Sequence, residues 1–215
     1  MSVPATSWWV EKYKGSAAEF HARPVDDEPD AEVWMLSVSR PALVLGSSQR
    51  DDIVDTDACQ ARGIDIVRRR SGGGAVLLVP GEVLWVDVIV PSGHPRWDAD
   101  VAKATWWLGE AWAAALGGGD VHREPLCKTR WGSVVCFGAL GPGEVSIDGR
   151  KVVGISQRRT RSAARFQCAV LGRWDAGEIC SLLRLDDPSA AVADLAQVAG
   201  GVSLSGLGDR FLAAI

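Results

Sequence analysis

The sequence lacks the segments that direct a chain into a membrane or out of the cell. It has no apolar run of the roughly 18 residues that a membrane span needs. Its N-terminus has no basic start followed by an apolar core, so we expect no signal peptide. The 5 cysteines are an odd, scattered set without a CxxC pair, which gives no zinc spacing and favours a reduced protein. These absences predict a cytoplasmic protein with no metal site and no membrane partner.

An excess of basic residues is also missing. The net charge is −4 at pH 7, so the chain has no overall basic footprint for nucleic acid. Hydrophobic residues make up 47% of the 215 positions, which is ample material for a core. Because the sequence contains neither an internal repeat nor a low-complexity segment, we expect residues 1–215 to form a single domain.

Hydrophobic periodicity predicts an α/β fold, with a single mixed and largely antiparallel sheet and helices packed on it. We expect helices at 7–21, 51–62, 98–116, 176–184, 189–198 and 206–215. Strands are expected at 32–40, 41–48, 64–67, 133–137 and 165–174. Two hairpins are expected, one joining 75–79 to 83–90 around Pro80-Gly81 and one joining 144–147 to 151–159 around Asp148-Gly149.

The run RRRSGGGAV, from Arg68 to Val76, stands between two strand-like apolar segments, where consecutive glycines are costly to order. Glycine allows backbone N–H groups to approach a ligand, and arginine pairs with an anion in bidentate fashion. The run therefore predicts a site for a carboxylate, a phosphate or an acyl phosphate, in surroundings that suit a hydrophobic tail. The alternative is a tight glycine-rich turn with a solvated basic edge.

Two further features carry candidate chemistry. Lys151 follows a tight turn in DGRKVVGISQRR, residues 148–159, and is either a surface charge at a hairpin end or an active-site cation. Cys136 precedes Lys151 by 15 residues. Buried cysteines are usually inert, whereas a thiol beside a lysine or an arginine has a lowered pKa and can act as a nucleophile.

The ordered pair RRRSGGGAV and DGRKVVGISQRR resembles the lipoate–biotin protein ligase family, and within it the lipoate-protein ligases and octanoyltransferases. The resemblance extends from about Val33 to Trp174 and includes the early segment LVLGSSQR, which contains Gln49. It implies a mixed sheet with helices on one side and a substrate tunnel over it. It also implies transfer of a lipoyl or octanoyl group to a lysine of a carrier protein. Because few residues follow Trp174, we expect no accessory C-terminal domain.

The resemblance implies roles for the residues at matching positions. Arg70 holds the anionic end of the acyl ligand or its adenylate, and Lys151 contacts the ligand carbonyl or the adenylate phosphate. Both would stabilise negative charge that develops during the reaction. The other positions that the resemblance implies in ligand binding are Gln49, Ser71, Gly72, Gly73, Gly74, Ala75, Gly154 and Gln157.

The family contains two chemistries. Ligases activate a free acid with ATP and Mg²⁺, whereas transferases take the acyl group from a carrier thioester through an enzyme cysteine and need no ATP. Cys136-Phe137 resembles the cysteine–phenylalanine pair of one octanoyltransferase branch, and the Asn-Asp pair usual in the ligases is absent. We therefore favour thioester transfer through Cys136 slightly over the ATP route, with octanoate or lipoate as the acyl group in either case.

Departures from the family pattern keep other functions open. Most relatives carry a histidine on the strand that here contains Gln167 and Cys168, and residues 77–79 replace the usual polar pair after the glycine run. The chain is therefore also consistent with an atypical acyl substrate, a non-catalytic acyl-binding paralogue or a biotin-ligase relative.

Six lysines and arginines lie between Arg150 and Arg165. They form either a solvated strand edge or a docking site for an acidic acyl-carrier or lipoyl-domain protein, because charge complementarity speeds encounter. Nucleic acid is a weaker alternative, since the chain is acidic overall.

Overall fold

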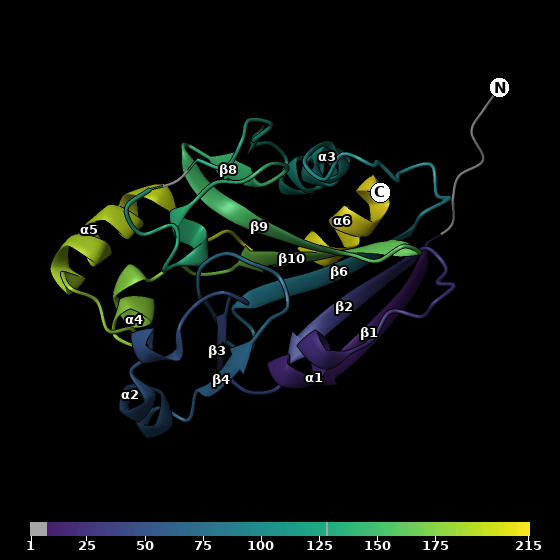
Figure 1. Cartoon of the computed structure of the whole chain (residues 1–215). Helices are drawn as coiled ribbons and strands as arrows, with labels where there is room; N and C mark the ends of the chain where they lie inside the picture. Colours follow the sequence, from purple (N-terminus) through teal and green to yellow (C-terminus); the bar gives the residue numbers. More distant parts are fainter. Residues whose placement is uncertain (1–7, 128) are drawn as a thin grey trace.

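Two β-sheets form the scaffold of the computed structural model, which describes residues 8–127 and 129–215 (Figure 1). The strands are β1 (Trp9–Gly15), β2 (Glu32–Val38), β3 (Ala42–Leu45), β4 (Asp65–Arg68), β5 (Val76–Leu78), β6 (Val83–Pro91), β7 (Asp120–Val121), β8 (Val145–Ile147), β9 (Arg150–Arg159) and β10 (Ala163–Leu171). The large sheet has the order β1-β2-β6-β10-β9-β8-β7, and only its β1–β2 pair is parallel. The small sheet has the order β4-β3-β5, with β3 parallel to β4 and antiparallel to β5.

Helices cover both faces of the large sheet (Figure 1). They are α1 (Ala17–Ala22), α2 (Thr56–Ala61), α3 (Trp106–Leu116), α4 (Ala176–Cys180), α5 (Pro188–Val198) and α6 (Leu207–Ala214), with 3-10 turns η1 (Asp51–Ile53), η2 (Lys103–Thr105) and η3 (Cys136–Gly138). α3 and α6 pack together on one face, where the rings of Trp112 and Phe211 stack with centroids 3.9 Å apart. α1 and the small sheet lie on the opposite face, and α2, α4 and α5 pack around the small sheet.

Successive side chains of the central strands β6 and β10 point alternately to the two faces of the large sheet. On β6, Val86 faces α3 and α6, whereas Trp85 and Asp87 point to the α1 side. On β10, Phe166 faces α3 and α6, whereas Gln167 points to the α1 side and pairs in register with Asp87. Both strands are therefore buried on two faces, and the polar side chains of the sheet centre collect on the α1 side.

The α/β class with a mixed, largely antiparallel sheet is confirmed, and the small sheet is an addition that the sequence did not predict. The hairpin around Asp148-Gly149 is also confirmed, with φ values of 51° and 74° between β8 and β9. The hairpin around Pro80-Gly81 is wrong, because β5 joins the small sheet while β6 lies between β2 and β10. Since β6 is buried on both faces, burial between two neighbouring strands outweighs pairing with the adjacent segment of the chain.

The helix expected over 7–21 is wrong for the described part of that segment. Residues Trp9–Gly15 form β1 instead, and the helix begins only at Ala17; residue 7 lies outside the described residues. Ser16 and Glu19 form a capping box at this start, in which each side chain accepts a hydrogen bond from the other's backbone N–H. Aromatic and β-branched side chains before the cap fit a pleated strand, so pairing with β2 overrides the helical pattern.

Candidate acyl-ligand site

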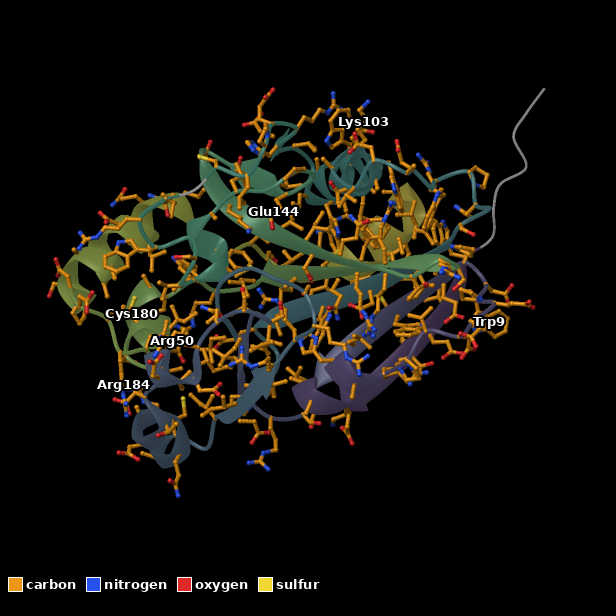
Figure 2. All side chains as sticks on the ribbon, viewed as in Figure 1. Trp9, Arg50, Lys103, Glu144, Cys180 and Arg184 are labelled. Atoms are coloured by element: carbon orange, nitrogen blue, oxygen red, sulfur yellow. The ribbon has the colours of Figure 1, made fainter. Side chains whose placement is uncertain are left out.

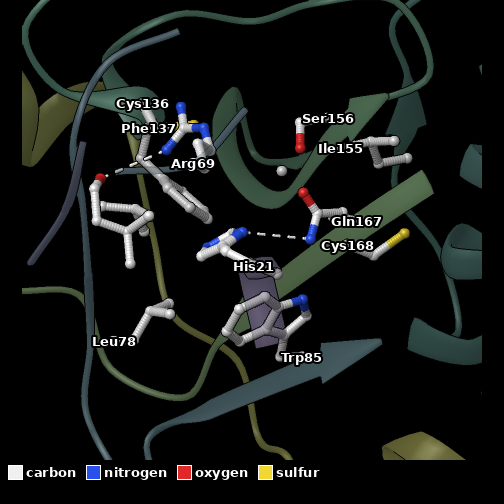
Figure 3. Close-up of a pocket in the computed structure, with 14 residues that line it drawn as sticks. His21, Arg69, Leu78, Trp85, Cys136, Phe137, Ile155, Ser156, Gln167 and Cys168 are labelled. Carbon is white, nitrogen blue, oxygen red and sulfur yellow. Dashed lines mark hydrogen bonds between the residues drawn. The ribbon is translucent and has the colours of Figure 1, made fainter. Parts of the chain in front are cut away.

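A cavity lies between the large sheet, α1, the small sheet and η3, and Figure 3 shows the side chains that line it. Its apolar wall includes Val44, Val76, Leu78, Trp85 and Phe137. Its polar groups are the side chains of His21, Arg69, Ser156 and Gln167 and the thiol of Cys136. A mostly apolar wall with a few convergent polar groups is typical of a small-molecule site.

The glycine run packs directly against the segment that carries Cys136. The Ala75 N–H donates to the Val134 carbonyl (2.7 Å), and the Cys136 N–H donates to the Ala75 carbonyl (2.8 Å). A Cβ atom on Gly74 would lie 2.5 Å from the carbonyl carbon of Val135, so only glycine permits this approach. Segment 133–137, expected as a strand, instead ends in η3, and these backbone contacts hold it against the glycine run.

Gln49 supports the same segment from the loop after β3. Its amide nitrogen donates to the carbonyls of Ser133 (3.1 Å) and Val134 (2.9 Å), and its Oε1 accepts from the Gly46 N–H (2.9 Å). The backbone is also crowded here, because a Cβ on Gly46 would lie 1.9 Å from the Gly73 carbonyl oxygen. Gln49 lies behind the cavity wall, so its direct contact with a ligand stays a prediction.

The consecutive arginines of the motif point to different places. Arg68 donates to backbone carbonyls of the loop after β3, at 2.7 and 2.6 Å. Arg69 is buried and lines the cavity, whereas Arg70 is exposed and lines a neighbouring hollow. The anion contact predicted at Arg70 therefore stays a prediction, and the arginine inside the cavity is Arg69. Val67 and Arg69 are less exposed than Ile66 and Arg68, an alternation that the structure shows but the apolar pattern Ile64–Ile66 did not predict.

Arg69 brings a positive charge without a counter-ion to the cavity wall. Its guanidinium group donates to the carbonyls of Gly72 (2.9 Å), Gly74 (2.7 Å) and Val44 (3.4 Å). The residue is 5% exposed, and no carboxylate within residues 8–127 and 129–215 forms an ion pair with it. A buried cation of this kind favours a thiolate, a carboxylate or an oxyanion in the cavity.

Lys151 is buried beside the cavity, and its ammonium group is fully engaged. Nζ lies 2.6 Å from Glu144 Oε2 and donates to the carbonyls of Cys136 (3.0 Å) and Ala139 (2.9 Å). Figure 2 shows Glu144 inside the molecule, in contrast to the exposed Lys103. Because an ammonium group has only three protons, Lys151 in this structure holds η3 and thereby Cys136. Its predicted contact with a ligand carbonyl stays a prediction.

The other predicted site residues divide between the cavity and its surroundings. Gly154 lines the cavity, and Ser71 reaches it through its Oγ, which donates to the cavity residue Ser156 at 3.2 Å. The first two glycines of the run, at 72 and 73, are exposed. Gln157 points to the opposite face of β9, because successive side chains of a strand alternate, and it hydrogen-bonds the loop before η2.

A polar network that the sequence analysis did not single out enters the cavity from α1 and the sheet. Gln167 Nε2 donates to Asp87 Oδ2 at 3.3 Å and lies 3.4 Å from His21 Nδ1. Arg165 Nη2 lies 2.5 Å from the same carboxylate oxygen, and the Trp85 indole donates to the other oxygen at 2.7 Å. The available signal was an aspartate within the apolar run LWVDVIV, since an acidic residue is almost never fully buried unless it is paired.

The titratable side chains in and around the cavity differ in pKa and in exposure. Burial and the positive charges of Arg69 and Arg165 lower the pKa of His21 to about 3, so its imidazole is neutral at physiological pH. The Cys168 thiol lies on the α3 and α6 side of β10, where burial strongly raises its pKa and keeps it protonated and unreactive. Cys136 is only partly buried, so it is the accessible thiol of the two.

A basic hollow lies farther along β9 and β10 than the cavity. Arg70, Arg158 and Thr160 line it, and the buried Arg165 lies cross-strand from Arg158. Arg158 is four positions beyond the cavity residue Gly154, which corresponds to roughly 14 Å along a strand. The exposed guanidinium groups could bind a phosphate or a carboxylate outside the acyl cavity.

Fold and cavity together define the class of protein: residues 16–204 match the lipoyl protein ligase A/B catalytic domain, and the chain belongs to this family. The curated octanoyltransferase LipM of Kyrpidia tusciae is 32% identical over 165 residues, which cover 72% of this chain and 58% of that protein. The octanoyltransferase LipM of Clostridioides difficile is 26% identical over 158 residues, covering 68% of this chain and 55% of that protein. The chain thus spans a little over half the length of these relatives.

Solved structures confirm the fold. A bipartite lipoate protein ligase from Thermoplasma acidophilum superimposes with a TM-score of 0.70 at 17% identity, covering 96% of this chain and 80% of that one. At this identity the similarity defines the architecture alone. Within the described residues, no helix is both long and apolar enough to cross a membrane.

Proposed function

We propose that this chain carries the acyl-transfer site of an enzyme that attaches an octanoyl or lipoyl group to a lysine of a carrier protein, by thioester exchange at Cys136. The observation that carries the proposal is the position of Cys136, whose accessible thiol lines an apolar cavity that also contains the uncompensated charge of Arg69. The relatives named octanoyltransferase LipM support the same chemistry.

The proposed reaction has two steps. The Cys136 thiolate attacks the carbonyl carbon of a donor thioester, and the donor leaves as a thiol with the proton that Cys136 released. The amine of the carrier lysine then attacks the acyl-enzyme, an amide forms, and Cys136 regains a proton. The apolar wall would hold the acyl chain, while Arg69 favours the anionic species that occur beside it. This route requires neither ATP nor Mg²⁺.

An acidic carrier would dock at the basic hollow. Arg70, Arg158 and Arg161 are exposed, and none of them forms an ion pair within the described ranges 8–127 and 129–215. Arg70 and Arg158 line the hollow, and Arg161 lies in the turn after β9, so these charges would supply the complementarity that speeds encounter with an acidic protein.

Intact-mass spectrometry tests the nucleophile. After incubation with octanoyl-acyl carrier protein, the protein should gain the mass of one octanoyl group, and hydroxylamine should remove it. Cys136→Ala should not gain this mass, whereas the matched control Cys127→Ser, at an exposed cysteine outside the cavity lining, should gain it. An octanoyl adduct on Cys136→Ala would show that the nucleophile is elsewhere.

The same assay separates the alternatives. Transfer from free octanoate to a lipoyl domain that depends on ATP would establish the ligase route instead. Tight binding of octanoate with neither an adduct nor transfer would indicate a non-catalytic paralogue. For docking, loading of Arg158→Glu/Arg161→Glu from the acidic carrier should be slower and less salt-dependent, with unchanged loading from the small thioester octanoyl-N-acetylcysteamine.

A further inference from the structure

One polar group of the cavity has no part in the transfer described above, the imidazole of His21. α1 carries this side chain into the cavity, where its ring packs against Trp85 with centroids 4.7 Å apart. Figure 3 shows the ring between Gln167 on one side and the wall formed by Arg69 and Phe137 on the other. The imidazole therefore lies inside the space that an acyl ligand would enter.

The end of α1 is clamped to the sheet, which fixes the position of the ring. Arg165 donates to the carbonyls of Phe20 and Arg23, each at 2.7 Å, and so binds the residues on both sides of His21–Ala22. Asp87 holds the guanidinium group in turn, with Arg165 Nε 2.6 Å from Oδ2. A buried ion pair with two additional carbonyl contacts leaves the helix end little freedom.

Gln167 determines which ring nitrogen of His21 carries the proton. Its amide nitrogen faces the Asp87 carboxylate at 3.3 Å, a position that requires a donor. The second proton of the same amide is available to His21 Nδ1 at 3.4 Å, so Nδ1 accepts and the proton lies on Nε2. Nε2 has no hydrogen-bond partner among the residues that the structure describes, and a free N–H donor thus remains for a ligand.

The surroundings keep this donor uncharged. The charged and titratable groups near the ring are Arg69, Asp87, Cys136 and Arg165. Burial, and after it the charges of the two arginines, lower the pKa of His21, so the imidazole retains a single proton on Nε2. A neutral imidazole can polarise a carbonyl group by hydrogen bonding without transferring its proton.

We propose that His21 is a catalytic residue whose Nε2–H donates a hydrogen bond to the acyl carbonyl oxygen while Cys136 attacks the carbonyl carbon. The inference rests on the proposed acyl transfer. As the new C–S bond forms, the π electrons move to oxygen, and His21 stabilises that oxyanion. Collapse restores the C=O bond and expels the donor thiolate, which takes up the proton released by Cys136. His21 keeps its own proton throughout.

Single-turnover acylation of Cys136 by octanoyl-N-acetylcysteamine tests this role. His21→Phe retains a ring against Trp85 but has no donor, and it should lower the acylation rate about a hundredfold, the usual effect of losing one oxyanion donor. His21→Gln, which can place an amide N–H near the position of Nε2, should recover part of the rate. Alkylation of Cys136 by iodoacetamide develops no carbonyl oxyanion, so its rate should be the same in all three proteins.

The possible results are distinct. Wild-type protein that forms no octanoyl adduct would contradict the proposed function itself. Wild-type acylation with an equally fast His21→Phe would overturn the role of His21 alone. Equal losses in acylation and alkylation would assign His21 to the structure of the cavity. Loss of a limb of the acylation pH profile near neutrality in His21→Phe would make His21 a general base, which also overturns the donor role.

Discussion

Two buried ion pairs on the adjacent strands β9 and β10 hold opposite sides of the cavity. Lys151 pairs with Glu144 and donates to the carbonyls of Cys136 and Ala139. Arg165 pairs with Asp87 and donates to two carbonyls at the end of α1, the helix that carries His21 into the cavity. Each cation is paired with a carboxylate. Each also donates hydrogen bonds to backbone carbonyls, Lys151 to η3, which contains Cys136, and Arg165 to the end of α1, which contains His21.

The two pairs differ in the cation and in what it can hold. Lysine is a point charge with three rotatable donors. The single Nζ atom of Lys151 therefore binds two carbonyls of the tight 3-10 turn η3 and its C-cap, those of Cys136 and Ala139. Arginine is a planar fork, and Arg165 reaches the carboxylate and two carbonyls in different directions. The comparison teaches that Lys151 holds the turn that carries Cys136, the proposed nucleophile, while a second pair, outside the sequence motifs, holds the helix that carries His21, the proposed hydrogen-bond donor.

The largest expected effect comes from removing one carboxylate. Glu144→Ala and Asp87→Ala each leave a buried cation unpaired, and each should lower the free energy of unfolding in urea by about 3–5 kcal/mol. The double variants Glu144→Leu/Lys151→Met and Asp87→Leu/Arg165→Met remove both charges and should be more stable than the corresponding single variants. Double variants no more stable than the single ones would show that the carbonyl contacts, and not the unpaired charge, dominate.

A smaller effect is expected at the glycine run, on the nucleophile side alone. Gly74→Ala places a Cβ 2.5 Å from the Val135 carbonyl carbon and should destabilise the fold by about 1–3 kcal/mol, with a changed rate of Cys136 alkylation by iodoacetamide. Gly72→Ala is the matched control, because its Cβ would meet nothing within 4 Å. If both alanine variants behave alike, the close packing of Gly74 does not position Cys136.

The most gradual expected effect is a pH dependence on the donor side, which is small for any single pH unit. The pKa of His21 is about 3 in the folded protein and 6.5 as an ordinary histidine, so between these values the unfolded chain binds more protons. His21 should therefore make the free energy of unfolding rise with pH from about 3 to 6.5, by at most about 1.4 kcal/mol per pH unit. Urea unfolding of wild type and His21→Phe across this range gives the contribution as a difference. Parallel curves would mean that His21 titrates normally.

Local sequence rules predicted the elements whose partners are close in the chain. The Asp148-Gly149 hairpin needs only its turn residues and two flanking strands, and it is confirmed. The α3 end at Gly117, with φ of 80°, likewise follows from a left-handed residue at a helix C-terminus. The errors fall where pairing is long-range: β1 pairs with β2, and β6 leaves β5 for β2 and β10. No local signal specifies which distant strand will bury an apolar segment.

Some residues of the candidate site could likewise be found from the sequence, and others only from the structure. The residues alone singled out the glycine run, because consecutive glycines between apolar segments are unusual, whereas Lys151 and Cys136 became candidates through the family resemblance. The choice of Arg69 as the cavity arginine depended on the direction of one side chain at the end of β4. His21 and Gln167 meet although 146 positions separate them, so their interaction was invisible in the sequence.

The sequence by itself determined the family, the glycine run and the presence of a cysteine that precedes a lysine-bearing strand. Tertiary structure decided that Lys151 binds Glu144 and two carbonyls, that Arg69 and not Arg70 enters the cavity, and that α1 delivers an imidazole. The physical reason is that residue type fixes which interactions a side chain can make. Burial, direction and the partner that neutralises a charge are set only when strands far apart in the chain come together.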